Sequence, residues 1–194
     1  MPGGQIRCPG SLADLIQMRV LTPDDWAIWR ELRLAALAES PRAFGTRLAD
    51  WQGEGDREER WRARLGIPGS VNVVAVQDGR PAGMVSGVPA AGGAAELISM
   101  WVSPPARGRG VGDRLVDAVE RWARPAGASV LRLAVAQGNE SAVALHWRNG
   151  FADTGESGDL MPDGVCREQI MAKLAGLLAP WAGMQAYANG AVRS

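Results

Sequence analysis

The segment that most constrains the fold is a strand pattern, a proline break and a glycine-rich turn that lead directly into a helix pattern. Residues 96–102 (Glu-Leu-Ile-Ser-Met-Trp-Val) predict a strand, and Pro104 follows closely. Residues 107–112 (Arg-Gly-Arg-Gly-Val-Gly) come next, and apolar residues recur at helical spacing over 110–123. The segment therefore predicts a strand–turn–helix unit.

Gly108, Gly110 and Gly112 remove side chains where the backbone turns into this helix. The backbone N–H groups are left free to point outward, and with the positive end of the helix they form an anion site. Arg107 and Arg109 add cationic donors that suit phosphate oxygens. The turn therefore predicts a binding site for a diphosphate.

Two common phosphate-binding loops do not fit this turn. A P-loop requires GxxxxGK[ST], and the chain has no Gly-Lys-Ser/Thr sequence. A dinucleotide fingerprint requires GxGxxG at the opening of a βαβ unit, whereas the glycines of 108–112 are spaced GxGxG and follow three successive strand patterns. A nucleotide-dependent kinase or oxidoreductase therefore lacks its loop here.

Apolar periodicity over the rest of the chain predicts the order β-α-α-β-β-β-α-β-α-β. The expected elements lie at 18–21, 26–38, 54–65, 71–76, 84–88, 96–102, 110–123, 130–135, 139–148 and 165–174. We therefore expect an α/β (α+β) fold: one domain at 18–174 with a central mixed, mostly antiparallel sheet flanked by helices. Residues 1–17 are expected to be a disordered leader or an extended start, and residues 175–194 a C-terminal tail.

Composition and charge exclude several classes of function. The 194 residues carry 21 Lys and Arg against 21 Asp and Glu, so bulk positive charge does not favour a nucleic-acid partner. Cys8, Cys166 and a single histidine are too few for a disulfide scaffold or a zinc centre, so we expect no metal. No apolar run approaches the roughly 18 residues that cross a bilayer. We expect no membrane partner and a reducing cytoplasm.

Two blocks resemble the GNAT family of acyl-CoA-dependent N-acetyltransferases. Arg107, Gly110 and Gly112 fit its R/Q-x-x-G-x-G/A pattern, which follows a V-x-P break provided here by Val102 and Pro104. The sequence Asn-Glu-Ser-Ala-Val-Ala-Leu-His-Trp-Arg-Asn-Gly-Phe at 139–151 is similar to the family's N-x-x-A-x-x-L-Y-x-x-x-G-F signature. Residues 32–45 also resemble the first helix and following loop of many bacterial members. The resemblance covers roughly 18–174.

The resemblance implies acetyl-CoA as cosubstrate and a set of residues to hold it. In this family the strand before the glycine turn parts from its neighbour and pairs with the pantetheine arm. The backbone of Met100, Trp101 and Val102 would then bind the pantetheine amides, and Asn139 would lie near the thiol end. The pyrophosphate would be held by the amides of Arg107, Gly108, Arg109, Gly110, Val111 and Gly112.

The reaction implied by the resemblance is direct attack of a neutral amine on the thioester. Glu96 lies eleven residues before Arg107, where some members carry a base glutamate; the alternatives are an ordinary solvated strand-edge residue or one that binds the amine. His146 occupies the slot of the usual tyrosine acid, and an imidazolium with a near-neutral pKa could protonate the thiolate. The alternative is a half-buried helix residue, with water or Tyr187 as the acid.

Other candidates carry weaker signals. Ser99 could bond the acetyl carbonyl or the acceptor, although small strand residues usually only pack. Cys166 is most simply a buried thiol. Four tryptophans in the N-terminal region are expected to be mostly core, with one or two walling an apolar acceptor: Trp26, Trp29, Trp51 and Trp61.

The function expected from the resemblance is transfer of the acetyl group of acetyl-CoA to a primary amine of a small molecule or peptide. The alternative is a catalytically weak acyl-CoA-binding sensor or assembly module, which the histidine at 146 keeps open. Many relatives dimerise, so a homodimer is considered, with Trp181 of the tail in its interface.

Overall fold

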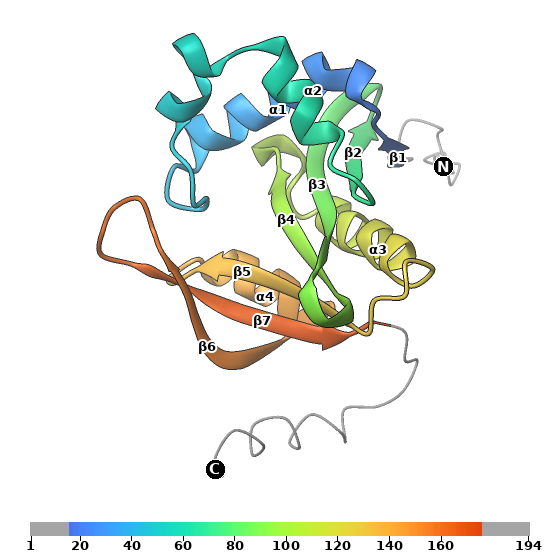
Figure 1. Ribbon diagram of the computed structural model, residues 1–194, viewed down its shortest axis with the longest axis vertical. Helices are drawn as coiled ribbons and strands as arrows, with labels where there is room; N and C mark the ends of the chain where they lie inside the picture. Colours follow the sequence, from blue (N-terminus) through green and yellow to red (C-terminus); the bar gives the residue numbers. More distant parts are fainter. Residues whose placement is uncertain (1–15, 176–194) are drawn as a thin grey trace, which may run out of the picture.

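The computed structural model describes residues 16–175, which form one seven-stranded sheet with helices on both faces (Figure 1). The strands lie in the order β1-β2-β3-β4-β5-β7-β6, and only the β4–β5 pair is parallel. The expected α+β class and mixed, mostly antiparallel sheet are confirmed. The strands are β1 (Gln17–Val20), β2 (Val71–Gln77), β3 (Arg80–Ala90), β4 (Ala94–Val102), β5 (Val130–Ala136), β6 (Ala152–Leu160) and β7 (Arg167–Leu174). The helices are α1 (Trp26–Glu39), α2 (Glu58–Leu65), α3 (Val111–Ala123) and α4 (Glu140–Arg148).

The expected element order was wrong in one respect, because it omitted strand β6. This strand reads Ala-Asp-Thr-Gly-Glu-Ser-Gly-Asp-Leu and lies at the edge of the sheet, where most of its residues face solvent. Its pairing with β7 shifts register twice, and Gly155 has a φ of 76°. A polar, glycine-containing edge strand carries no apolar alternation, so periodicity could not find it.

Two further boundaries differ from expectation. Helix α2 begins at Glu58 rather than at residue 54, because Gly53–Gly55 forms a separate 3-10 turn. Strand β3 is longer than expected and runs through Pro89 to Ala90.

Two apolar cores lie on opposite faces of the sheet. Helix α3 packs its buried face, which includes Val111, Leu115 and Val119, against β2, β3 and β4. Helices α1 and α2 cover the other face, where Trp29 and Trp61 are fully buried (Figure 1). Each valine or leucine fully buried in these cores contributes on the order of 1.5–3 kcal/mol of transfer free energy.

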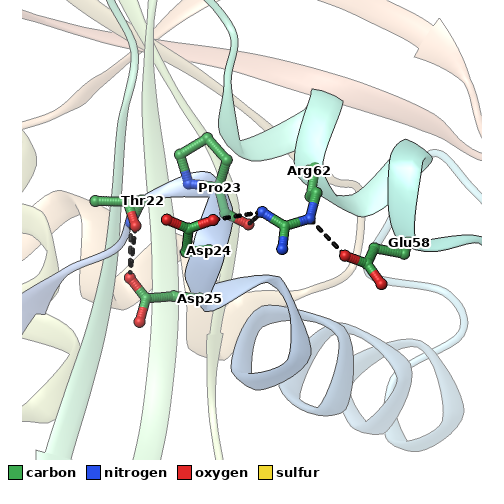
Figure 2. A network of polar contacts seen from close by, with 6 residues as sticks. All are labelled: Thr22, Pro23, Asp24, Asp25, Glu58 and Arg62. Carbon is green, nitrogen blue, oxygen red and sulfur yellow. Dashed lines mark hydrogen bonds and ion pairs between the residues drawn. The ribbon is translucent and has the colours of Figure 1, made fainter.

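A network of polar contacts fixes α2 to the chain that enters α1 (Figure 2). The guanidinium of Arg62 lies 2.6 Å from carboxylate oxygens of both Glu58 and Asp24 and also donates to the carbonyl of Pro23. Thr22 donates its backbone N–H to Asp25 at 2.9 Å. Each exposed ion pair contributes little by itself, but together they hold the orientation in which α2 presents its other face to the sheet.

Strands β4 and β5 separate after three residue pairs. Ala94, Ala95 and Glu96 pair with residues 130–132, and no later residue of β4 pairs with β5. Figure 1 shows the two strands diverging from this point. The rest of β4 therefore keeps unpaired backbone groups on the side that faces β5.

A β-bulge lies in β4 beyond this separation. Ser86 of β3 pairs with Ile98, but Met84 pairs with Trp101, so β4 carries one extra residue between these pairs. Ser99, within the bulge, has a φ of 55°, which is rare for a residue other than glycine.

Within residues 16–175, no helix is long and apolar enough to cross a membrane.

Candidate active site

The turn before α3 has the open backbone that its glycines predicted. Gly108 and Gly110 have φ values of 74° and 80°, in the region that favours glycine, and a Cβ at either position would meet no atom within 4 Å. Gly112 serves packing instead, because a Cβ there would lie 3.1 Å from the methyl carbons of Leu145 in α4. The turn therefore leaves open space above its backbone and brings α3 close to α4.

The N–H groups of this turn are free to bind a ligand. Gly110 caps α3 in the left-handed conformation. In the described part of the chain, no acceptor bonds the N–H groups from Gly108 to Gly112, whereas Arg114 already donates to the carbonyl of Gly110. These N–H groups and the helix dipole favour an anion.

The arginine side chains of the turn lie differently from the sequence expectation. The guanidinium of Arg107 lies 2.7 Å from a carboxylate oxygen of Glu39 and donates to the carbonyl of Val102 at 3.0 Å. Hydrogen bonds from Arg107, Ser40 and the indole of Trp101 lower the pKa of Glu39 to about 2. The positive charge of Arg107 is therefore already balanced by a carboxylate.

Arg109 borders a separate hollow beside Asp78 and Arg80, whereas Arg148 lies on the open side of the turn. Arg148 forms an ion pair with Asp113, with 2.8 Å between nitrogen and oxygen. The sequence reasoning missed Arg148, although it ends the helix that carries the second family-like block.

Most of the predicted cofactor residues line one cavity of about 380 Å³, here called the loop cavity. Val111 is an exception, since its side chain is buried in the core under α3. Asn139 caps α4 by accepting the N–H of Ala142 at 3.3 Å. The residues predicted for the cofactor that line the loop cavity are Met100, Trp101, Val102, Arg107, Gly108, Gly110, Gly112 and Asn139.

A second cavity of about 240 Å³, here called the central cavity, lies where β4 and β5 separate. Six residues line both this cavity and the loop cavity: Ala43, Phe44, Met100, Asn139, Ala142 and His146. The other walls of the central cavity are formed by Arg33, Gly45, Leu97, Ile98, Ser99, Leu133, Ala134, Val135 and Glu168. The separation of the strands therefore places a second, smaller cavity next to the one beside the glycine turn.

His146 lies at the junction of the two cavities, but its expected near-neutral pKa was wrong. Its side chain is 5% exposed, its ring packs edge-on against Phe151, and its Nδ1 atom has no partner among the described residues. Burial, and secondly the charge of Arg148, lower the pKa of His146 to about 4. The imidazole is therefore neutral at pH 7 and cannot act as an imidazolium in the free protein.

Glu96 is exposed and borders a neighbouring space of about 380 Å³, here called the acidic hollow. This hollow also contains Asp159, Glu168 and Arg132. Arg132 pairs with Glu156. The acidic hollow is therefore rich in carboxylates whose charge Arg132 does not balance.

Glu168 of β7 borders both the acidic hollow and the central cavity, and the sequence reasoning missed it. Burial, followed by repulsion from Asp159, raises the pKa of its carboxyl group. Glu168 lies in the polar start of β7, between Arg167 and Gln169, so no apolar pattern in the sequence marked it. Glu96 and Glu168 therefore both border the acidic hollow, and of the two only Glu168 also borders the central cavity.

The weaker candidates have clear positions. Ser99 lines the central cavity and accepts a hydrogen bond from Arg64 at 3.4 Å. Trp29 and Trp61 are core, as expected, and Trp51 stacks on Trp61 at 4.6 Å. None of the four N-terminal tryptophans lines the loop cavity, the central cavity or the acidic hollow.

Cys166 is half-buried and free. Tyr187 and Trp181 lie outside the described residues, as do the leader up to residue 15 and the tail from residue 176. The described residues contain no group of three or more histidine, cysteine or acidic side chains that could hold a metal ion.

Comparisons with known proteins agree with this geometry. Residues 29–151 match the acetyltransferase (GNAT) family. An "IAA acetyltransferase" of Azospirillum brasilense is 42% identical over 72 residues, which are 37% of this chain and 47% of that protein. The chain therefore matches about half the length of this relative.

Solved structures show the same fold. A GNAT-family acetyltransferase from Streptococcus pneumoniae superposes with a TM-score of 0.67 at 20% identity, over 84% of this chain and all of that one. The yncA protein of Salmonella typhimurium, solved with its cofactor acetyl-CoA, gives a TM-score of 0.66 at 21% identity over 87% and 99% of the two chains. With a family match over more than half of its length, an open glycine turn and parted strands, the chain belongs to the GNAT family of acetyltransferases.

Proposed function

We propose that this protein transfers the acetyl group of acetyl-CoA to a primary amine of a small molecule or peptide. The observation that carries the proposal is the separation of β4 from β5 directly beside a turn with free N–H groups. This arrangement offers the unpaired backbone of residues 100–102 to an amide-bearing chain and the turn to a diphosphate. When bound, acetyl-CoA supplies an activated thioester carbonyl.

The residues present fit acetyl-CoA. Gly108 and Gly110 leave open space, so a phosphate can approach their backbone closely. Met100, Asn139 and His146 border both cavities, which places them where the thioester would pass from the loop cavity to the central cavity. The amides of the turn bind by charge and geometry, without requiring the side chain of Arg107.

The acidic hollow supports an amine as the acceptor. An amine is protonated in water and is attracted by the carboxylates of Glu96, Asp159 and Glu168. A carboxylate must then remove one proton to free the lone pair for attack. We assign this to Glu96 and Glu168 together: Glu96 is exposed to the incoming ammonium, and Glu168, with its raised pKa, adjoins the central cavity.

His146 acts in this proposal as a neutral hydrogen-bond donor. A neutral imidazole keeps one N–H, which can stabilise charge that develops on the departing sulfur. This role needs no imidazolium and is compatible with the burial of His146.

The experiment is a coenzyme A release assay with a thiol reagent and a broad panel of primary amines. We expect amine-dependent release. His146→Phe, which keeps a ring and removes the N–H, should lower kcat by about 10-fold or more and leave the affinity for acetyl-CoA unchanged.

Tight acetyl-CoA binding without release by any amine would instead favour the acyl-CoA sensor. Absence of acetyl-CoA binding by the folded protein would refute the proposal as a whole.

A further inference from the structure

Two arginines lie at or next to the wall of the central cavity without a carboxylate partner. Arg33 of α1 is 7% exposed and Arg64 of α2 is half-buried. Neither appears in an ion pair within residues 16–175. Buried charged side chains are normally paired, so this pair of guanidinium groups requires an explanation.

The surroundings of Arg33 satisfy only part of its guanidinium. One nitrogen, Nη2, donates to Thr46 Oγ1 at 3.1 Å, and the guanidinium carbon lies 4.5 Å above the ring centre of Phe44. The other terminal nitrogen, Nη1, is buried and has no partner among the described residues. A buried donor without a partner is costly, so a structural role alone accounts poorly for this arginine.

Arg64 adds positive charge but does not neutralise Arg33. Its guanidinium donates only to neutral oxygens, at Asn72, Ser86 and Ser99, over 3.0–3.4 Å. Burial and the charge of Arg64 lower the pKa of Arg33 to about 10, which leaves it protonated at pH 7. The side of the central cavity that Arg33 lines is therefore positive, and Arg64 approaches it through Ser99.

The position of Arg33 separates it from the site proposed for the diphosphate. Arg33 borders the central cavity and does not border the loop cavity, which contains the glycine turn. Glu168 borders the same central cavity from β7. The cavity thus presents one unpaired cationic group and one carboxylate from different elements.

We propose that the acceptor amine carries a carboxylate in the same molecule, and that Arg33 binds this carboxylate while Glu96 and Glu168 receive the amine. The inference rests on the proposed acetyl transfer to an amine. A planar carboxylate fits the fork of one guanidinium and carries the single negative charge that one arginine balances. The substrate class is a small aminocarboxylate, such as an amino acid, in agreement with a central cavity of about 240 Å³.

The test compares pairs of acceptors that share an amine and differ only in the carboxylate. Amino acids and their carboxamides are assayed as acceptors by coenzyme A release. We expect the wild-type kcat/KM to be about 10- to 100-fold higher for the free carboxylates, the range for a charge-assisted hydrogen bond. Arg33→Met should remove this preference, and Arg33→Lys should restore it only in part, because lysine lacks the fork.

Arg30→Gln is the matched control, since Arg30 lies nearly one turn earlier in α1 and pairs with Asp56. It should keep the wild-type preference. Acetyl-CoA affinity by calorimetry reports whether each variant is folded, and the comparison of acceptors on wild type remains decisive if Arg33→Met does not fold.

Equal turnover of carboxylates and carboxamides by wild type would overturn this inference and leave the proposed function standing. Preference for carboxylates that persists in a folded Arg33→Met variant would also overturn it. Absence of release with every amine would overturn the proposed function and this inference with it.

Discussion

The burial of His146 predicts a specific dependence of stability on pH. Its pKa is about 4 in the folded protein against 6.5 in a model peptide, because burial disfavours the imidazolium. Below pH 6.5 the unfolded chain binds a proton at this residue that the folded protein does not bind. The contribution of His146 is therefore fully present above pH 6.5 and is lost as the pH falls toward 4.

The size of this effect follows from the same two pKa values. Between pH 6.5 and 5, the folded imidazole stays neutral while the unfolded one becomes protonated. Each pH unit in this window is worth about 1.36 kcal/mol, so the free energy of unfolding should fall by about 2 kcal/mol. Arg148 is a secondary cause of the shift and stays charged throughout.

The assay is urea denaturation of wild type and of His146→Gln at several pH values from 7 to 5. Other groups, including Glu168, titrate in both proteins, so the difference between the two curves isolates His146. We expect the wild type to lose about 2 kcal/mol more than the variant over this range. The chain has one histidine, so a single imidazole resonance also reports its pKa directly.

Equal pH dependence of the two proteins, or an imidazole that titrates near 6.5 in the folded state, would refute the reasoning.

Three further predictions concern the turn, the core and the acceptor side. Gly110→Ala should weaken acetyl-CoA binding about 5- to 30-fold in calorimetry, because an alanine disfavours this φ by about 1–2 kcal/mol, so the free turn relaxes and binding must restore the angle. Gly127→Ala, at a φ of 77° in an open loop, should leave binding unchanged, and an equal loss of affinity in both variants would contradict this prediction. Lys173→Met should lower the free energy of unfolding by roughly 1.5–3 kcal/mol in denaturant, since the ammonium bonds the carboxylate of Glu120, and a change below 0.5 would be too small for this contact. Glu168→Gln should lower kcat/KM and alter the acidic limb of its pH profile, and an unchanged profile would remove Glu168 from proton transfer.

The glycine turn could be predicted because its information is local. The spacing of Gly108 and Gly110 encodes backbone angles that few other residues adopt, and the structure confirms an open turn before α3. The parting of β4 from β5 followed from the family resemblance and was confirmed by the register.

Properties set by tertiary contacts could not be predicted in the same way. The low pKa of His146 depends on how deeply its side chain is buried. The lack of a carboxylate partner at Arg33 depends on how the surrounding elements pack. Strand β6 was missed because an edge strand forms through pairing with β7 rather than through its own apolar pattern. That Glu96 and Glu168 border the same hollow required knowledge of the fold, since the two lie far apart in the chain.

Because β4 and β5 separate early, the parallel pairing at residues 94–96 is the direct link between strands β1–β4 and strands β5–β7 of this sheet. A ligand bound between β4 and β5 would form backbone hydrogen bonds in place of those that the two strands do not make with each other. Ligand at 100 times its dissociation constant would add about 2.7 kcal/mol to the free energy of unfolding, and amide hydrogens on the facing edges of both strands should then exchange more slowly with solvent.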